Sequence, residues 1–207
     1  MSSANPSPIY QGSPDKPVIS FMVNVAWGNE YLPQLLEILH SRGIKLTFFL
    51  QGSWVARFPE LARKISAAGH EIGNHAYTHP DMRSLSADEI YLELRKTNEV
   101  IGKELGLKPK FFTPPYGYYD GRVIDLAARE SMLTILWTLD TLDWKMTDSG
   151  EIFRRIIPHL RNGSLILMHP TESSMKALPA MLDAAREKSY EIGTVSEVLS
   201  VDKDLLT

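Results

Sequence analysis

Residues 69–80 have the sequence Gly69-His70-Glu71-Ile72-Gly73-Asn74-His75-Ala76-Tyr77-Thr78-His79-Pro80. Gly69 stands where a preceding helix should end, and Glu71 to Asn74 predict a short strand. The polar turn that follows carries two histidines, His75 and His79, spaced four residues apart. A helix end, a short strand and a polar turn in this order form one unit of a β-α repeat, and the rest of the chain follows the same order.

The alternation of short apolar runs with longer amphipathic stretches begins at Val18. The predicted strands are Val18 to Val25, Leu46 to Leu50, Glu71 to Asn74, Phe111 to Thr113, Leu133 to Thr138, Ser164 to Met168 and Glu191 to Thr194. The predicted helices are Tyr31 to Arg42, Phe58 to Ala68, Ala87 to Leu105, Arg122 to Glu130, Ile152 to Leu160 and Lys176 to Glu187. Ser86 and Glu89 form a capping box before the third helix. This alternation indicates an α/β fold with about seven parallel strands, either closed into a barrel or open as a doubly wound sheet.

The chain is expected to form one domain, residues 18–207, preceded by an extended or poorly ordered tail, residues 1–17. The tail carries four prolines among Ser, Gly and Asn residues, a composition that disfavours packed elements. The remainder has no low-complexity linker, and a chain of 207 residues with 43% hydrophobic residues can bury one sizeable core.

The composition excludes several classes of partner. A formal net charge of −3 with scattered Lys and Arg argues against nucleic acid and anionic lipid. No run approaches the roughly 18 to 20 apolar residues of a membrane span, and the N-terminus lacks the features of a secretion signal. The absence of cysteine excludes disulfides and thiolate metal ligands but leaves the compartment open. The oligomeric state also stays open.

Polar or unusual residues follow five of the predicted strands. They are Asn24 to Gly28, His75 to His79, Thr113 to Gly117, Asp140 to Trp144 and His169. Because the site of a parallel α/β fold lies at the carboxyl ends of its strands, we expect these five segments to meet at one mouth.

His75 and His79 are candidate metal ligands, since two neutral imidazoles suit Zn²⁺ or a similar divalent metal. Pro80 disfavours an α-helix at His79, so the pair is expected in a turn. A catalytic zinc normally takes a third protein ligand, which this motif does not supply. Two loop histidines bonded to the backbone or solvent are the structural alternative.

His169 follows the buried run Leu165 to Met168, a position suited to a general acid, and Asp143 could orient its ring. The alternative is a satisfied core histidine. The aromatic residues Tyr77, Tyr116 and Trp144 are candidates for lining a ligand cleft, although a core role is open for each. Pro115 lies in a rigid turn that could form a cleft wall or a plain loop corner.

Taken together, residues 17–199 resemble the NodB-homology polysaccharide deacetylases, carbohydrate esterase family 4. Residues 74–79 look like the family's H-[ST]-x-x-H motif, with Ala76 in place of Ser or Thr. Residues 113–117 look like R-x-P-x-G, residues 140–144 like D-x-x-D-W, and residues 165–169 like L-x-L-x-H. Thr47 to Phe49 also fall where the family's second strand lies.

The resemblance implies a distorted (β/α) barrel and metal-dependent removal of N-acetyl groups from a glycan. By this likeness His75 and His79 hold the metal, His169 protonates the leaving amine and Asp143 orients His169. Tyr116, Pro115, Trp144 and Tyr77 would contact the glycan. Members of the family act at the cell envelope or outside the cell, which is the localisation expected by resemblance.

The family's first motif, T-F-D-D-G, corresponds by this alignment to Met22-Val23-Asn24-Val25-Ala26. Asn24 then replaces the base aspartate and Val25 the metal-binding aspartate, while Thr113 replaces an arginine that pairs with the base. An amide cannot take a proton from water at neutral pH, and valine offers a cation no lone pair. A repair stays open, because Glu30, Asn24 or Asp81 could supply an oxygen ligand or act as base through water.

Two functions therefore compete. The first is a metal-assisted deacetylase with weakened or altered activity, acting on a cell-envelope or related glycan. The alternative is a catalytically inactive pseudoenzyme that binds glycan or protein through the former active-site cleft. An unrelated barrel hydrolase or isomerase is disfavoured by the order of the motifs.

Overall fold

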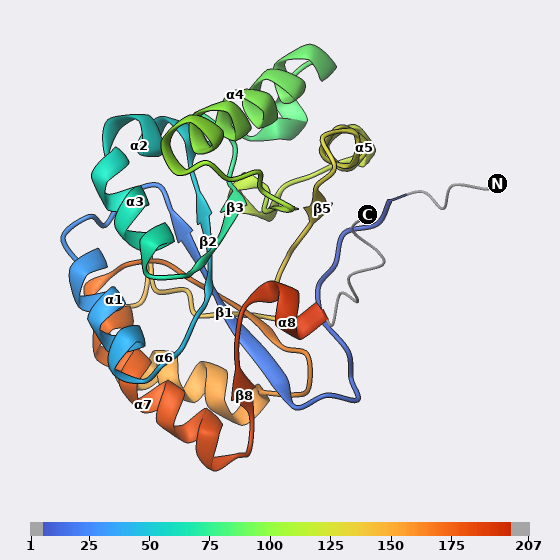
Figure 1. Cartoon of the computed structure of the whole chain (residues 1–207). Helices are drawn as coiled ribbons and strands as arrows, with labels where there is room; N and C mark the ends of the chain where they lie inside the picture. The colour runs from blue at the N-terminus through green and yellow to red at the C-terminus, as the bar shows by residue number, and fades with distance from the viewer. Residues whose placement is uncertain (1–5, 200–207) are drawn as a thin grey trace.

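The computed structural model of the chain describes residues 6–199 and contains one curled sheet with helices packed around it (Figure 1). The strands are β1 Val18–Val25, β2 Thr47–Leu50, β3 Glu71–Asn74, β4 Phe111–Phe112, β5 Leu133–Thr134, β6 Leu139–Asp140, β7 Leu165–Met168 and β8 Glu191–Ile192. The α-helices are α1 Leu32–Ser41, α2 Gly52–Arg57, α3 Pro59–Ala67, α4 Ala87–Leu105, α5 Gly121–Arg129, α6 Ser149–Ile156, α7 Glu172–Glu187 and α8 Val195–Leu199. Short 3₁₀ helices are η1 Met82–Ser84, η2 Pro115–Gly117 and η3 Ile157–His159.

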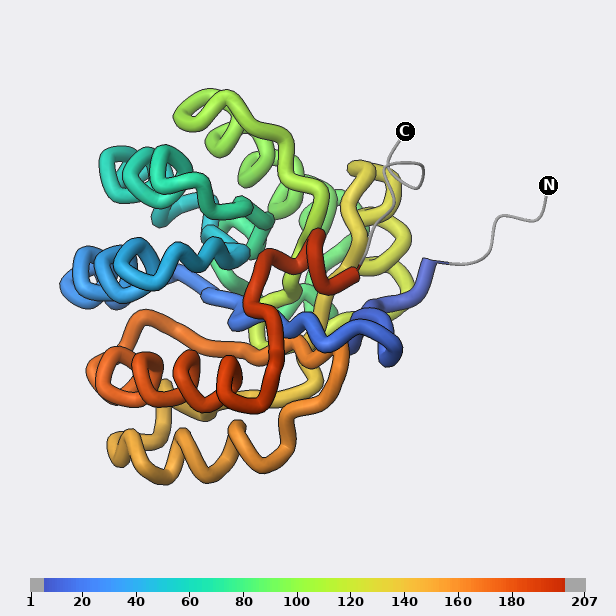
Figure 2. Tube along the Cα trace, turned by 60° about the horizontal axis from the view of Figure 1, so that its bottom comes forward, coloured from blue at the N-terminus to red at the C-terminus, as the bar shows by residue number. Residues whose placement is uncertain are grey.

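The sheet is parallel throughout and curls into a half-barrel. Its strand order is β5-β4-β3-β2-β1-β7-β6, and β8 adds a further pairing to the start of β1. Within residues 6–199 no pairing joins β5 to β6, so the barrel is open between these strands. The expected distorted barrel is therefore confirmed, and the doubly wound sheet is excluded. Figure 2 shows α4, α3, α1, α7 and α6 lying one beside another along the outer side.

The two faces of β1 serve different parts of the molecule, because side chains alternate across a strand. Val23 and Val25 belong to the large apolar cluster beneath the helices. Met22 belongs to a smaller apolar cluster with Phe49 and Phe111. Asn24, two residues further along the strand than Met22, lines a cavity instead. The strand thus supplies the core on one face and the site on the other.

The segment before β1 bridges the open side of the half-barrel. Ile9 donates a backbone hydrogen bond to Thr134 at 2.9 Å and accepts one from Leu136 at 2.7 Å. Gln11 forms an antiparallel bridge with Ser164, next to β7. Residues 9–11 therefore connect the two edges of the sheet. The division into a tail, residues 1–17, and a domain, residues 18–207, stays a prediction. The outer ends of these two segments, residues 1–5 and 200–207, lie outside the described residues.

Two predicted elements are divided in the structure. The single predicted strand Leu133 to Thr138 ends at Thr134 in β5, because Ile135 pairs with Ile9 and Thr138 donates to Leu165 near β7. A further strand, β6, follows at Leu139–Asp140. The predicted helix Phe58 to Ala68 begins at Pro59, and the additional helix α2 precedes it. Among the described residues, none of the helices is both long and apolar enough to cross a membrane.

Candidate functional site

A cavity of about 410 Å³ opens at the carboxyl ends of the strands. Its walls come from the turns after β1, β3 and β4, the segment around β6, and the end of β7. The lining residues are Asn24, Ala26, Trp27, His75, His79, Tyr116, Tyr118, Trp137, Asp140, Trp144, Leu167 and His169. All five segments expected at one mouth thus contribute to one cleft.

His75 and His79 lie side by side in this cleft. Their ring centroids are 4.8 Å apart at an interplanar angle of 74°. His75 Nδ1 is 2.7 Å from the carbonyl oxygen of Thr113, and since a carbonyl only accepts, Nδ1 carries the proton and Nε2 keeps its lone pair. Burial lowers the pKa of His75 to about 3, with the charge of His79 adding to the effect. Burial also lowers the pKa of His79. Both rings are therefore neutral near neutral pH.

The turns of the cleft hold four non-glycine residues in the left-handed region. These are Ala76, His79, Tyr116 and Leu142, with φ values of 58°, 64°, 59° and 53°. Local hydrogen bonds hold this backbone in place: Glu93 accepts from the amides of residues 77 and 78, and Asp140 accepts from the Leu142 amide at 2.8 Å. Such conformations cost about 1 to 3 kcal/mol each and cluster at functional sites.

His169 is held by the buried carboxylate of Asp143. Asp143 Oδ1 lies 2.8 Å from His169 Nδ1, and Oδ2 accepts from the His169 amide at 2.6 Å and from the Ser174 hydroxyl. This pairing fixes the ring with Nε2 free. Trp27 stacks on the ring of His169, with centroids 5.7 Å apart and planes 9° from parallel.

The turn that carries Trp27 approaches the turn after β7 closely. Gly28 has a φ of +81°, and a Cβ there would lie 2.1 Å from the carbonyl oxygen of Pro170. Only glycine fits this contact without a shift of the backbone. The close approach brings Trp27 against His169.

Asn24 is 4% exposed, and its Oδ1 is a buried atom without a hydrogen-bond partner among the described residues. Its neighbour Val25 is fully buried in the apolar cluster beneath the helices and does not line the cleft. Thr113 is fully buried, and its hydroxyl donates to the carbonyl of Ile135 at 3.0 Å. The cleft wall near β1 therefore presents an amide and no carboxylate.

The sequence profile of the family described as polysaccharide deacetylase matches residues 11–134, more than half of the chain. The chain belongs to the polysaccharide deacetylase family. This membership confirms the resemblance expected from the motifs.

Two curated relatives cover most of this polysaccharide deacetylase-like chain. The uncharacterized protein YlxY of Bacillus subtilis is 47% identical over 199 residues, which are 96% of this chain and 62% of that protein. A peptidoglycan-N-acetylglucosamine deacetylase of Bacillus cereus is 31% identical over 180 residues, 84% of this chain and 66% of that protein. The chain thus spans less than two thirds of either relative.

Among solved structures, a CE4 family pseudoenzyme from Bacillus anthracis superposes with a TM-score of 0.93 at 43% identity. The superposition covers 95% of this chain and 70% of that one. A mutant of that pseudoenzyme, described as having restored enzymatic activity, gives the same TM-score at 42% identity over 95% of this chain and 72% of that one.

The structure brings most of the predicted site residues of this deacetylase-family chain together. Asn24, His75, His79, Tyr116, Trp144 and His169 line the cleft, and Asp143 lies directly behind His169. Pro115 is buried in η2 and does not line the cleft. Tyr77 packs near Gly52, and its ring centre is 5.9 Å from the Lys96 ammonium, outside the cleft. Substrate contact by Pro115 and Tyr77 stays a prediction without support from this geometry.

Three further aromatic residues that were not predicted from the sequence line the cleft: Trp27, Tyr118 and Trp137. Trp27 belongs to the polar turn after β1, so its position at a strand end was a usable signal. Trp137 lay inside a predicted strand, and Tyr118 lay one residue beyond the predicted turn. Their roles depend on where the chain bends, which local patterns do not specify.

A catalytic zinc normally takes three protein ligands, and this cleft offers two preorganised imidazoles. Glu30 is exposed and absent from the lining, and Asp81 pairs with Arg83 at 2.7 Å. Within residues 6–199, no group of three or more His, Cys, Asp or Glu side chains could hold a metal ion. The residues present therefore do not match the three-ligand site implied by the family resemblance.

A second hollow of about 450 Å³ adjoins the cleft. It is lined by Trp137, Thr138, Leu139, Asp140, Arg155 and His159. Trp137 and Asp140 line both spaces.

Proposed function

We propose that this chain is a catalytically inactive member of the polysaccharide deacetylase family that binds a glycan through the former active-site cleft. The observation that carries the proposal is the identity of the cleft-facing residue of β1. Asn24 occupies the inward position near the end of the strand, and Val25 points into the apolar cluster beneath the helices. We assign these two positions to the aspartates of the family's first motif, on the resemblance described from the sequence.

The chemistry of these side chains supports the loss of activity. A neutral amide cannot accept a proton from water at neutral pH, and the loss of a general base typically costs a factor of about 10² to 10⁴ in rate. Thr113 bonds to Ile135 and offers no cation to a carboxylate in the cleft. The likeness to the Bacillus anthracis pseudoenzyme points to the same conclusion.

Glycan binding is supported by the aromatic rim of the cleft. Trp27, Tyr116 and Trp144 are 45%, 59% and 58% exposed, although large aromatic side chains are usually well buried. They come from three different turns and face one cavity. Such rings stack against the apolar faces of sugars, whose hydroxyls bond to polar groups around them.

A weak metal-assisted deacetylase is the second candidate, and the intact half of the site favours it. His75 keeps Nε2 free, and the Asp143 and His169 pair retains the geometry of an oriented acid. In this function His75 and His79 would hold the metal, which would act as a Lewis acid on the substrate carbonyl.

The relatives support a proposal for the glycan and its location. The Bacillus cereus relative is named as a peptidoglycan-N-acetylglucosamine deacetylase, and we extend that substrate class to this chain as peptidoglycan-type glycan at the cell envelope or outside the cell.

The two candidates differ in acetate release and metal content. Oligosaccharide binding is measured by tryptophan fluorescence, since Trp27, Trp137 and Trp144 line the cleft. Acetate release and bound zinc are measured on the same chelator-treated protein. We expect binding that Trp144→Ala weakens, without acetate release. Zinc binding together with acetate release, both lost in His79→Ala, would instead establish the deacetylase.

A triple variant tests the alignment on which the proposal rests. Asn24→Asp, Val25→Asp and Thr113→Arg together should raise zinc affinity and acetate release above the background of the unmodified chain, because zinc can draw the carboxylate introduced at residue 25, the last residue of β1, out of the apolar cluster toward His75 and His79. Because Val25 packs in the core, the variant must first give a native circular dichroism spectrum. A folded triple variant that gains neither property would show that the first motif is misaligned.

A further inference from the structure

The formal charge of the cleft comes from a single lining residue. With histidines neutral, Asp140 is the one formally charged residue in the lining, and no Lys or Arg is among the lining residues. Its carboxylate is partly buried, and burial raises the pKa of Asp140. A partly desolvated carboxylate gains from a cationic partner.

Arg155 and Arg83 donate hydrogen bonds to atoms other than the Asp140 carboxylate. Arg155 donates through Nε to the backbone carbonyl of Asp140 at 2.7 Å, outside the cleft in the adjoining hollow. Arg83 stands 3.9 Å from the ring centre of Tyr118 and forms an ion pair with Asp81. The Asp140 carboxylate itself accepts from the Leu142 amide through Oδ1, and no residue in the range 6–199 donates to Oδ2.

The remaining polar groups of the cleft include further hydrogen-bond acceptors. His75 presents the lone pair of Nε2, because Nδ1 donates to Thr113. Asn24 adds a second acceptor, Oδ1, a buried atom without a hydrogen-bond partner among the described residues. A ligand with several N–H donors on one nitrogen matches this arrangement, whereas an acetamide offers a single N–H and adds an acceptor of its own.

The aromatic walls favour a cation as well. Trp27, Tyr116 and Trp144 line the cleft with exposed rings, and a ring face attracts an ammonium group by about 0.5 to 2 kcal/mol. Rings around a carboxylate and neutral acceptors form a common setting for ammonium recognition. The same rings accommodate the sugar that carries the amine.

From this arrangement we infer that the cleft selects glycans bearing a free, protonated amine, the de-N-acetylated hexosamines, over their N-acetylated forms, with Asp140 as the specificity-determining residue. The inference rests on the proposed glycan-binding function and names its ligand class. The chain would then bind the product of deacetylation. The reaction that must supply this ligand is hydrolysis of an N-acetyl group on a glycan.

The test compares two tetramers of equal length, one of glucosamine and one of N-acetylglucosamine, titrated into the full chain under conditions that protonate the amine. Tryptophan fluorescence and calorimetry report the two dissociation constants. We expect the glucosamine tetramer to bind about tenfold more tightly, the difference that one charge-assisted hydrogen bond supplies. Spermine, a linear polyamine, serves as a ligand with amines but no sugar and should bind more weakly than the glucosamine tetramer.

The matched variants are Asp140→Asn and Glu37→Gln, each of which removes one negative charge. The side-chain amide oxygen introduced by Asp140→Asn can still accept from the Leu142 amide, so the turn should fold. Glu37 is exposed on α1, away from the cleft lining. Asp140→Asn should lower the affinity for the glucosamine tetramer about tenfold more than the affinity for the N-acetylated tetramer, and so abolish the preference for the amine. Glu37→Gln should keep the preference.

Each result discriminates. Equal binding of the two tetramers, or tighter binding of the acetylated one, would overturn the inference and leave glycan binding intact. The inference would also be overturned if Glu37→Gln lost the preference as fully as Asp140→Asn, or if spermine bound as tightly as the glucosamine tetramer. Either result would indicate non-specific attraction between charges. Failure of both tetramers to bind would reject the proposed function itself.

Discussion

Asn24 and Val25 are adjacent in sequence but have opposite environments. Asn24 lines a cavity, whereas Val25 is enclosed by the aliphatic cluster beneath the helices. We therefore expect Asn24→Asp to fold with nearly normal stability. Val25→Asp alone should lower the free energy of unfolding by at least about 3 kcal/mol, because its carboxylate would be buried without a partner. Urea denaturation of both variants measures the difference, and equal stabilities would mean that Val25 faces the cleft.

His70 gives the fold a defined dependence on acid. Its Nδ1 accepts from the Leu46 amide at 3.2 Å, its ring packs on Phe48, and burial lowers its pKa to about 4. Above about pH 6.5 the ring is neutral in both the folded and the unfolded chain. As the pH falls from about 6.5 toward 4, only the unfolded chain takes up the proton, so His70 progressively destabilises the fold by up to about 3 kcal/mol.

The variant His70→Asn keeps an acceptor near the Nδ1 position and cannot titrate. It should reduce the loss of stability between pH 6.5 and 4 relative to the unmodified chain, measured by urea unfolding at a series of pH values. His75 and His79 contribute in the same direction, so the dependence should weaken but not vanish. An unchanged dependence would show that His70 is not neutral in the folded chain.

The position of a site residue could be predicted from the sequence where the residue belongs to a motif that follows a predicted strand. His75, His79 and His169 follow strands in a fixed order, so their convergence followed from the parallel sheet. Trp27 could have been found by the same rule. The stacking of Trp27 on His169 could not, since it depends on the close approach of Gly28 to Pro170, two segments far apart in sequence.

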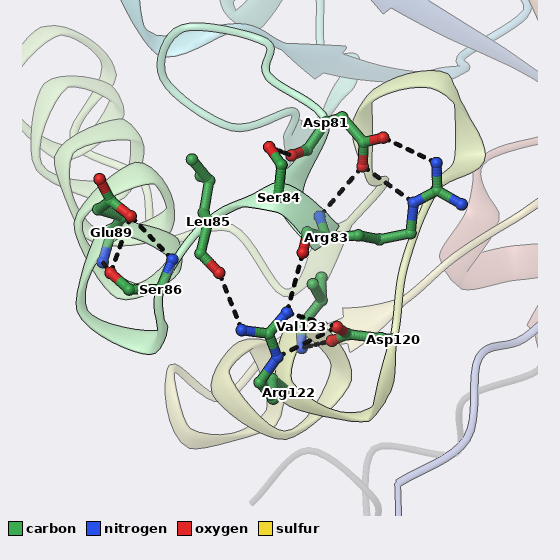
Figure 3. A network of polar contacts seen from close by, with 9 residues as sticks. All are labelled: Asp81, Arg83, Ser84, Leu85, Ser86, Glu89, Asp120, Arg122 and Val123. Carbon is green, nitrogen blue, oxygen red and sulfur yellow. Dashed lines mark hydrogen bonds and ion pairs between the residues drawn. The ribbon is translucent and has the colours of Figure 1, made fainter.

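The loop between β3 and α4 is tied to the start of α5 by one arginine. Arg122 donates from Nη1 to the Leu85 carbonyl at 2.9 Å and from Nη2 to the Arg83 carbonyl at 3.0 Å, while Asp120 holds its guanidinium (Figure 3). Arg83 in turn covers the ring of Tyr118, which lines the cleft. The cleft wall at Tyr118 is thus supported through η1.

Arg122→Ala should free η1 without unfolding the chain, because the side chain is about half exposed. We expect faster amide hydrogen exchange at Arg83 to Leu85 and weaker glycan binding. Arg95→Ala is the matched control: Arg95 is another exposed arginine, paired with Glu99 within α4. Exchange rates at η1 that are equal in the two variants would argue against this role for Arg122.

Sequence patterns predicted the bounds of helices and strands correctly where those bounds depend on neighbouring residues alone. The capping box of Ser86 and Glu89 forms at the predicted start of α4, and β1 has its predicted bounds. The division of the predicted strand 133–138 could not be foreseen, because it results from pairing with Ile9 and with β7. Apolar runs mark buried backbone but do not specify which distant segment completes its hydrogen bonds.

The N-terminal segment, residues 9–11, is expected to stabilise the whole molecule because it bridges the open side of the half-barrel. Ile9 hydrogen-bonds beside β5, Gln11 pairs beside β7, and the Tyr10 carbonyl accepts from the Thr138 hydroxyl at 2.7 Å. Ile9 also packs against the apolar cluster that contains Ile135 and Leu165. A composition rich in proline and serine indicated an extended conformation but concealed these contacts.

Deletion of residues 1–12 should therefore lower the free energy of unfolding by about 2 kcal/mol or more, since it removes an apolar side chain and several hydrogen bonds between the sheet edges. Deletion of residues 1–5 removes none of these contacts and serves as the control. Because the segment contacts Thr138, which borders the hollow beside the cleft, the longer deletion should also weaken binding of a glycan tetramer more than of a dimer. Thermal unfolding and titration of both truncations measure these effects, and equal stability of the two would show that residues 9–11 lie on the half-barrel without supporting it.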